Sequence, residues 1–139
     1  MPDPSPGTER SFRKEELPDN CLILDANALL SPFEFGFNLD LEVQRVAPGI
    51  KVLVPSSVLR ELEVLVKKGD WRVKAALELA GRYPCVDIKG KGDAPIFNLA
   101  KETGWMVMTQ DRKLRAALRK IGIPVLLIRG RGHLQVMEP

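Results

Sequence analysis

The sequence predicts a three-layer α/β/α domain with a mainly parallel central sheet. From residue 21 onward, short apolar runs of strand length alternate with segments of helical length. The apolar runs are continuous, which is typical of strands that are covered on both faces. Alternating strands and helices imply right-handed crossovers between parallel strands, with helices on both sides of the sheet.

The expected elements follow from these patterns and from residues that typically begin or end strands and helices. Pro55 stops the second strand, and the helix after it is expected to begin at Ser56 or Ser57, with Ser57 as the candidate N-cap. Asp70 is expected to cap the next helix. Residues 31–37 are expected to be a loop. Strands are expected at 21–25, 51–55, 84–88, 105–109 and 123–130, with an edge strand at 133–137, and helices at 39–46, 56–68, 71–81, 91–104 and 111–122.

The composition indicates one globular domain. The chain has 139 residues, of which 45% are hydrophobic and 28% charged. Its apolar runs are too short to span a membrane, and residues 1–10 show no secretory signal, so we expect a cytoplasmic protein. Residues 1–19 contain four prolines and little that packs, so we expect a flexible tail there and a domain over 20–139.

The cysteine and histidine content argues against a zinc site. Cys21 and Cys85 each begin an apolar run, so both are expected to be buried reduced thiols. No CxxC motif occurs and His133 is the single histidine, which is more typical of an incidental surface residue than of a catalytic one. Any bound metal would have oxygen ligands, which favours Mg²⁺ or Mn²⁺.

Two acids follow strands that should be neighbours. Asp25 ends the first strand and Asp111 follows the strand at 105–109. In parallel α/β sheets the ligand lies outside the carboxyl ends of the strands, where the strand order reverses. An acid directly after an apolar run needs solvent, a donor or a metal. Asp93 opens a helix toward the same edge, although Asp93 and Asp111 also have an ordinary interpretation as helix N-caps.

Glu61 is the fourth candidate. It flanks the inward stripe of Val58, Leu62 and Leu65, although a salt bridge or a solvated position explains it as well. Asn27 and Thr109 are polar neighbours of the strand-end acids. Each is a candidate to orient a carboxylate or a bound water, or simply forms turn and strand-end hydrogen bonds.

A cluster of carboxylates has a definite chemical requirement. The charges repel and raise one another's pKa unless cations compensate them. Two divalent ions would balance four carboxylates, polarise a phosphate, generate hydroxide from water and stabilise the leaving oxygen. The charge of the chain fits a polyanionic partner, because the net charge is +3 and residues 112–137 are basic without an acid. A solvated basic helix explains this charge equally well.

Four segments resemble the motifs of the PIN-domain nucleases. LILDANALL (22–30) resembles the first motif, and VPSSVLRELEVL (54–65) the second, with Glu61 as its acid. GDAPIFNLA (92–100) resembles the third, and the stretch from MVMTQDRKL to the glycine at 130 the fourth. The similarity covers about residues 21–136 and is greatest to the archaeal and eukaryotic branch that contains ribosomal RNA processing proteins.

The resemblance implies a metal-dependent endoribonuclease. Asp25, Glu61, Asp93 and Asp111 would ligate Mg²⁺ or Mn²⁺, and water would attack phosphorus to leave a 5′-phosphate and a 3′-hydroxyl. Relatives in this branch often carry two adjacent Asp residues in the third motif, whereas Asp93 stands alone. This departure implies one firmly held metal and a second that is weak or depends on substrate phosphate.

The expected partner is RNA, in particular a ribosomal RNA precursor. A basic helix beginning beside Asp111 is positioned to guide a phosphate backbone toward the metal. A homodimer also fits the resemblance, because small PIN domains often pair. The residues expected to bind RNA are Arg112, Lys113, Arg115, Arg119 and Lys120.

Three other functions are open from the sequence. A catalytically silent PIN module would bind RNA or a ribosome-assembly partner without cutting. A toxin-type ribonuclease would act with an antitoxin partner, although the fourth motif favours ribosomal RNA processing. A phosphotransferase with Asp25 as nucleophile expects a second Asp two residues later, where this chain has Asn27.

Overall fold

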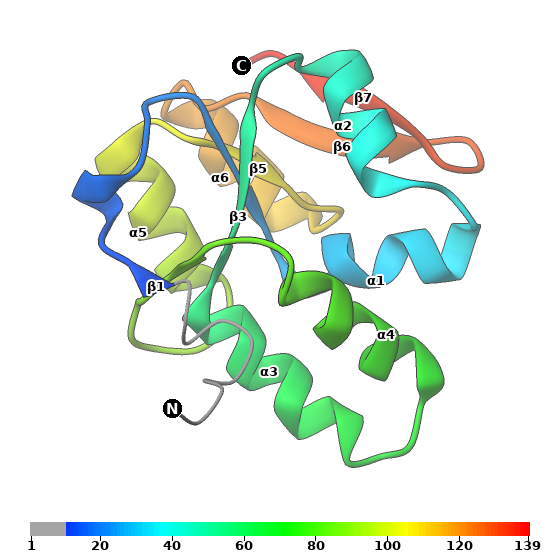
Figure 1. Ribbon diagram of the computed structural model, residues 1–139. Coiled ribbons are helices and arrows are strands. Elements are labelled where there is room, and N and C mark those ends of the chain that lie inside the picture. The colour runs from blue at the N-terminus through cyan, green and yellow to red at the C-terminus, as the bar shows by residue number, and fades with distance from the viewer. Residues whose placement is uncertain (1–10) are drawn as a thin grey trace.

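A computed structural model describes residues 11–139, and within them one seven-stranded sheet runs through the molecule (Figure 1). The strand order is β1-β4-β3-β2-β5-β6-β7, and all neighbours pair in parallel except β6 and β7. The strands are β1 (Ser11–Phe12), β2 (Cys21–Leu24), β3 (Lys51–Pro55), β4 (Cys85–Val86), β5 (Met106–Met108), β6 (Val125–Arg129) and β7 (His133–Met137).

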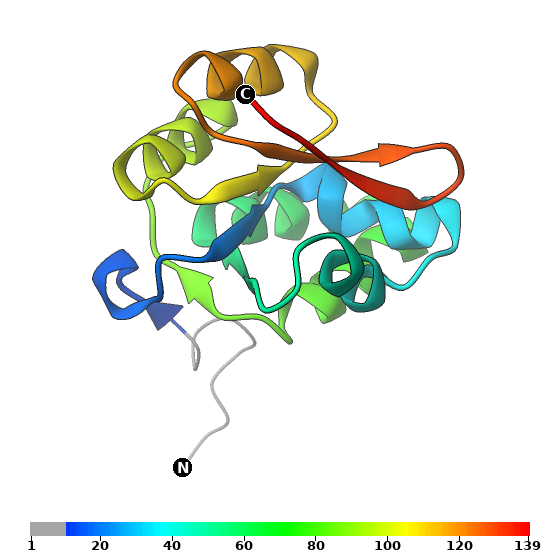
Figure 2. The same ribbon diagram turned by 90° about the horizontal axis from the view of Figure 1, so that it is seen from above.

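Helices cover both faces of this sheet, as the sequence predicts. The α-helices α1, α3 and α4 pack together on one side, whereas α5 and α6 lie on the other (Figure 2). The helical elements are η1 (Lys14–Glu16), α1 (Ala26–Phe35), α2 (Leu39–Val46), α3 (Ser56–Val66), α4 (Trp71–Ala80), α5 (Asp93–Thr103) and α6 (Arg112–Lys120). The side changes because the chain builds the sheet from β2 toward β4 and then returns to β2 before adding β5 and β6.

The central strand β2 determines where the functional edge lies. All four of its residues are buried, and it pairs with β3 on one side and β5 on the other. Its register sets Leu24 opposite Met108 of β5. The carboxyl ends of β2 and β5 therefore coincide at the reversal of strand order, which confirms that these two strands are adjacent.

The segment at 31–37 is not the expected loop, because α1 continues through it to Phe35. Pro32 lies inside the helix and has no N–H to donate to the carbonyl of Ala28, four residues earlier. The Ser31 hydroxyl donates to that carbonyl instead, with an Oγ–O distance of 2.6 Å. This side-chain substitute for a backbone hydrogen bond allows the helix to contain a proline.

The predicted tail does not extend to residue 19. Residues 1–10 lie outside the described residues, but Ser11 and Phe12 form β1, which pairs in parallel with β4. The carbonyl of Pro18 accepts a hydrogen bond from the Trp105 indole at 3.1 Å. The sheet therefore begins before the predicted domain boundary at residue 20.

The other expected elements are present, with several ends shifted by a few residues. Both cysteines are buried free thiols, as predicted. Trp105, which directly precedes β5, is buried, and β7 is the antiparallel edge strand that the sequence indicates. In the described part of the chain, no helix has the length and apolarity needed to cross a membrane.

Ser31→Ala should destabilise the protein because it leaves the buried carbonyl of Ala28 without a donor. We expect a loss of about 1 kcal/mol and a melting temperature lower by a few degrees. In a Pro32→Ala background the residue at position 32 regains its N–H, so the same serine substitution should have little effect. Equal losses in the two backgrounds, measured by thermal unfolding, would contradict this explanation of α1.

Candidate active site

Asp25 follows the buried strand β2 and begins α1. Its Oδ1 accepts a hydrogen bond from the N–H of Ala28 at 2.7 Å, so the carboxylate caps the helix. The side chain is also enclosed, since Asp25 is only 7% exposed. The fold therefore holds this carboxylate largely out of water, and the hydrogen bond from one backbone donor does not by itself replace the lost hydration.

Asp111 occupies the equivalent position on the neighbouring strand. Its Oδ1 accepts from the N–H of Leu114 at 2.9 Å and caps α6. The N–H of Asp111 donates to Oγ1 of Thr109 at 3.1 Å, and the Thr109 hydroxyl hydrogen-bonds to Asp25. Thr109 is fully buried and thus links the two strand-end acids.

Glu61 and Asp93 approach this pair from opposite sides of the sheet. Glu61 lies on α3, and Asp93 is the first residue of α5, after Gly92 with φ 74°. Both acids are exposed, but with Asp25 and Asp111 they line one cavity of about 100 Å³ at the carboxyl edge. The structure thus brings all four predicted acids together, and Asn27 lines the same cavity.

A set of hydrogen bonds ties the start of α3 to the segment before α5. The Ser56 hydroxyl accepts from the N–H of Ile88 at 2.8 Å. The Arg60 guanidinium donates to the carbonyls of Ile88 and Gly90 at 2.8 and 3.3 Å. These contacts fix the approach to Asp93 against the helix that carries Glu61.

The prediction of Ser57 as the N-cap of this helix is wrong. The helix begins at Ser56, and its N-cap is Pro55, which has no side-chain acceptor. The Ser56 hydroxyl is engaged with Ile88, and Ser57 lies one residue inside the helix, where it lines the cavity. Sequence reasoning missed this placement, although Ser57 precedes Glu61 by four residues and so shares its helix face.

The electrostatics of the cavity follow from burial and from like charge. The pKa of Asp25 is raised to about 6, mainly by burial and also by the nearby charges of Asp93 and Glu61, although hydrogen bonds from Thr109 and Ala28 act in the opposite direction. Partial burial and the neighbouring Asp111 raise the pKa of Asp93. The site therefore holds negative charges that an added cation would stabilise.

The donor set fits a hard divalent cation. All four acids offer oxygen ligands, and no thiol or imidazole lines the cavity. Within residues 11–139, no three acid, histidine or cysteine side chains already stand as a complete ligand group. Asp25 and Asp111 are fixed as helix caps, whereas Glu61 is exposed on α3, and Asp93, which is also exposed, forms a side-chain hydrogen bond with Asp111.

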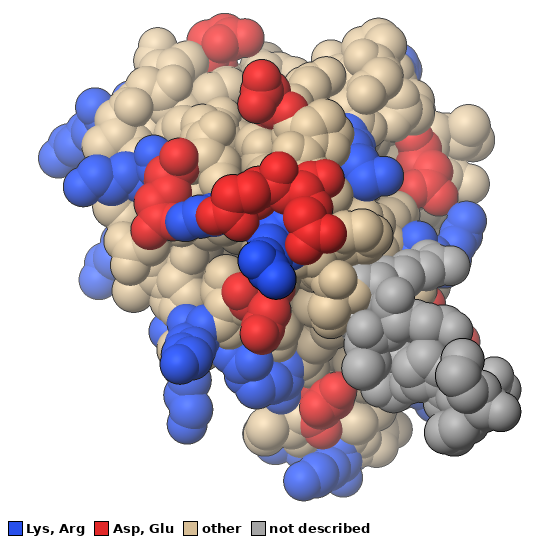
Figure 3. All heavy atoms as spheres, turned by 60° about the vertical axis from the view of Figure 1, so that its left-hand side comes forward, with Lys and Arg blue, Asp and Glu red and all other residues tan. Residues whose placement is uncertain are grey.

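Other surfaces are distinguishable from this site. A groove of about 430 Å³ continues from the cavity along α3 and carries Arg60 and Lys91. A second cavity of about 430 Å³, between β1 and α5, contains none of the four acids. Acidic side chains gather on the face that carries η1 and α5 (Figure 3), where Lys14 pairs with Glu102.

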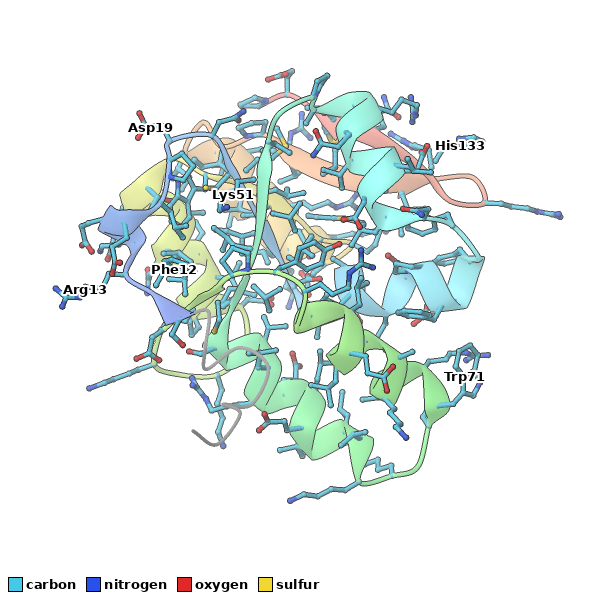
Figure 4. All side chains as sticks on the ribbon, viewed as in Figure 1. Phe12, Arg13, Asp19, Lys51, Trp71 and His133 are labelled. Carbon is cyan, nitrogen blue, oxygen red and sulfur yellow. The ribbon has the colours of Figure 1, made fainter. Side chains whose placement is uncertain are left out.

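The remaining aromatic and histidine candidates lie away from the cavity. Trp71 points outward at the start of α4 and is 62% exposed (Figure 4). Its ring meets Phe33 edge to face, and the Arg72 guanidinium lies 5.8 Å from its centroid. His133 lies on β7, 3.8 Å from Glu42. None of these residues lines the carboxylate cavity.

Comparison with known proteins agrees with this geometry. The family profile described as "PIN like domain" matches residues 22–131. The chain belongs to the PIN-like domain family. This PIN-like domain is 29% identical over 124 residues to "Ribonuclease VapC4" of Methanocaldococcus jannaschii, covering 83% of the chain and 95% of the relative. It is 28% identical over 120 residues to "Ribonuclease VapC9" of Archaeoglobus fulgidus, covering 76% and 80%.

A solved structure shares the fold of this PIN-like domain. "Structure of the PIN domain endonuclease Utp24" matches with a TM-score of 0.73 and 23% identity, covering 88% of this chain and 95% of that one. At this identity the match supports the fold alone. The predicted family and the three-layer fold are thus both confirmed.

Asp25→Asn should stabilise the metal-free protein at neutral pH. The folded pKa of Asp25, about 6, lies above the ordinary value of 3.8, so folding stability falls as pH rises through this range. Asparagine keeps an oxygen for the N–H of Ala28 and removes the buried charge. We expect a gain of roughly 2 kcal/mol at pH 7.5 in chelator, shrinking toward pH 5.

Thermal unfolding across this pH range measures the effect. Glu63→Gln is the matched control, because Glu63 is an exposed acid on α3 outside the cavity. It should change the melting temperature little at any pH. A lower melting temperature for Asp25→Asn at pH 7.5 would refute the assignment of a destabilising buried charge.

Proposed function

We propose that this PIN-like domain is a metal-dependent endoribonuclease that hydrolyses RNA phosphodiester bonds. The observation that carries the proposal is the convergence of four acids from four elements on one cavity, with the pKa of the buried Asp25 raised to about 6. Buried acids are costly to folding, and a cluster of them is typical of a site that binds cations. The two curated relatives are named ribonucleases, which supports RNA as the substrate.

Each acid has a role in this proposal. Asp25 and Asp111 hold the first ion, since their positions are fixed by the helices they cap, and Thr109 orients Asp25. Glu61 and Asp93 complete the ligand set, and Asn27 is available to orient a bound water. These residues would hold Mg²⁺ or Mn²⁺, which would supply Lewis-acid polarisation of a phosphate and activation of a water. The expected products are a 5′-phosphate and a 3′-hydroxyl.

The same geometry supports a proposal on the number of ions. Only Asp25 and Asp111 are held by both a strand end and a helix cap, whereas Asp93 is exposed and has no acidic neighbour in sequence. We therefore propose one firmly bound ion and a second that depends on RNA phosphate. Calorimetry should give one tight Mn²⁺ site without RNA, and two tight sites would contradict this part of the proposal.

The basic helix α6 is the proposed guide for the RNA backbone. It begins at Asp111, and its apolar residues Leu114 and Leu118 are buried, so its charged side chains line the outer surface. The face of η1 and α5 carries acidic and basic side chains together (Figure 3), whereas every charged side chain of α6 is basic. The residues proposed to contact phosphate are Arg112, Lys113, Arg115, Arg119 and Lys120.

We propose ribosomal RNA processing as the biological role, because the fourth motif favours that branch of the family. The alternative is a toxin-type ribonuclease with an antitoxin partner. Depletion of the protein should cause a ribosomal RNA precursor to accumulate. If depletion leaves precursors unchanged and overexpression arrests growth, the toxin role is correct instead.

Asp25→Asn and Asp111→Asn should each abolish RNA cleavage. Wild-type protein is expected to cut single-stranded RNA in Mg²⁺ or Mn²⁺ and to stop in chelator, with each substitution lowering the rate by at least about a hundredfold, because a ligand of the essential ion is lost. Gel analysis of labelled RNA measures the rate. Cleavage that survives both changes would contradict the site, and RNA binding without cleavage by the wild type would establish the silent-module alternative.

Arg115→Glu with Arg119→Glu should weaken RNA binding and flatten its salt dependence. Two cations are replaced by anions on the proposed path, so fewer counterions are released when RNA binds. Fluorescence anisotropy over a range of salt concentrations gives both quantities. Arg115→Glu alone and Lys51→Glu at the start of β3 change the net charge by the same amount, so comparing these two single variants is the control for charge (Figure 4). Equal losses in the two proteins would remove α6 from the proposed path.

A further inference from the structure

Ser57 has a property that no other residue in the described part of the chain shares. Its Oγ is the single buried side-chain nitrogen or oxygen in residues 11–139 without a hydrogen-bond partner. The residue is only 7% exposed. A buried hydroxyl without a partner is unfavourable for folding, so its presence indicates a role in binding.

Neighbouring hydroxyls show that the local structure is able to satisfy such groups. Ser56, the preceding residue, accepts from Ile88 and donates within the same segment. Ser31 donates to Ala28, and Thr109 is hydrogen-bonded to both strand-end acids. Ser57 is thus the exception among buried hydroxyls.

The position of Ser57 shows which space its hydroxyl faces. Ser57 lines the cavity of the four acids and also the adjoining groove along α3, so it lies at the junction between them. It belongs to the first turn of α3, whose N-cap Pro55 provides no side-chain acceptor. The positive end of the helix and a free hydroxyl therefore face the same space, which favours an oxygen ligand.

We propose that the Ser57 hydroxyl is a binding residue for the oxygen ligand of the carboxylate cavity. This inference rests on the proposed function and identifies a contact that the four acids do not make. The ligand is an oxygen that accepts the Ser57 proton in a hydrogen bond. Two sources have this chemistry, namely a phosphate oxygen of the RNA or a water held by a bound cation.

Ser57→Ala tests the proposal when its effects on stability and on ligand binding are measured together. In chelator the melting temperature should stay the same or rise, because the variant loses an unsatisfied buried group. If the partner is a metal-held water, calorimetry should show Mn²⁺ affinity lower by about fivefold to tenfold. If the partner is a phosphate oxygen, Mn²⁺ affinity should be unchanged and kcat/KM for RNA lower by about tenfold.

Ser31→Ala is the matched control, because Ser31 is an equally buried serine that lies outside the cavity. It should lower the melting temperature and leave Mn²⁺ affinity and RNA cleavage unchanged, the reverse of the Ser57 pattern. Unchanged Mn²⁺ affinity together with unchanged RNA kinetics in Ser57→Ala would overturn the proposal. A melting temperature as low as that of Ser31→Ala would overturn it too.

The same measurements separate this proposal from the proposed nuclease function. If the wild type does not cleave RNA, anisotropy of a labelled RNA in Mn²⁺ replaces the kinetic measurement. A loss of Mn²⁺ or RNA affinity in Ser57→Ala would then support the Ser57 contact while the hydrolytic function fails. Equal affinities of the two proteins would reject the contact.

Discussion

The arrangement of this protein depends on one electrostatic constraint, the burial of the Asp25 carboxylate at the end of the central strand. No Lys or Arg lines the cavity that surrounds it, and the nearest charges are acids. Among residues 11–139, the compensation for this charge comes from hydrogen bonds donated by Ala28 and Thr109. A folded protein retains such a charge when function requires it, because its removal would improve stability.

The fold provides the geometry that this constraint needs. The reversal of strand order at β2 sets the ends of β2 and β5 side by side, so two acids that are far apart in sequence cap adjacent helices. Helices α3 and α5 lie on opposite faces of the sheet and place Glu61 and Asp93 on opposite sides of this pair of acids. The hydrogen bonds of Ser56 and Arg60 with the segment before α5 hold these two approaches together.

Much of this arrangement was predictable from the sequence, because it depends on patterns that are local. Continuous apolar runs predicted the strands, and acids that follow those runs predicted a functional site at the carboxyl edge of the sheet. The features that were missed depend on contacts that no local pattern contains. Residues 31–37 were expected to be a loop, but α1 continues through Pro32, where the Ser31 hydroxyl donates in place of the absent N–H. Residues 11 and 12 were assigned to the tail because two residues are too few to show a strand pattern. Ser57 was predicted to be an ordinary helix cap. Only the structure shows that its buried hydroxyl has no hydrogen-bond partner, which indicates another role.

The proposed cation site is tested most directly by calorimetry of Mn²⁺ binding to the chelator-treated protein at pH 7.5 and at pH 5. Mn²⁺ should bind the wild-type protein saturably and release protons. Its affinity should be lower at pH 5, because protonation of Asp25 competes with the ion. Binding should be lost in the Asp25→Asn, Asp111→Asn double variant, which should remain folded. Binding by the double variant with wild-type affinity would show that Asp25 and Asp111 do not hold the cation and would contradict the proposed site.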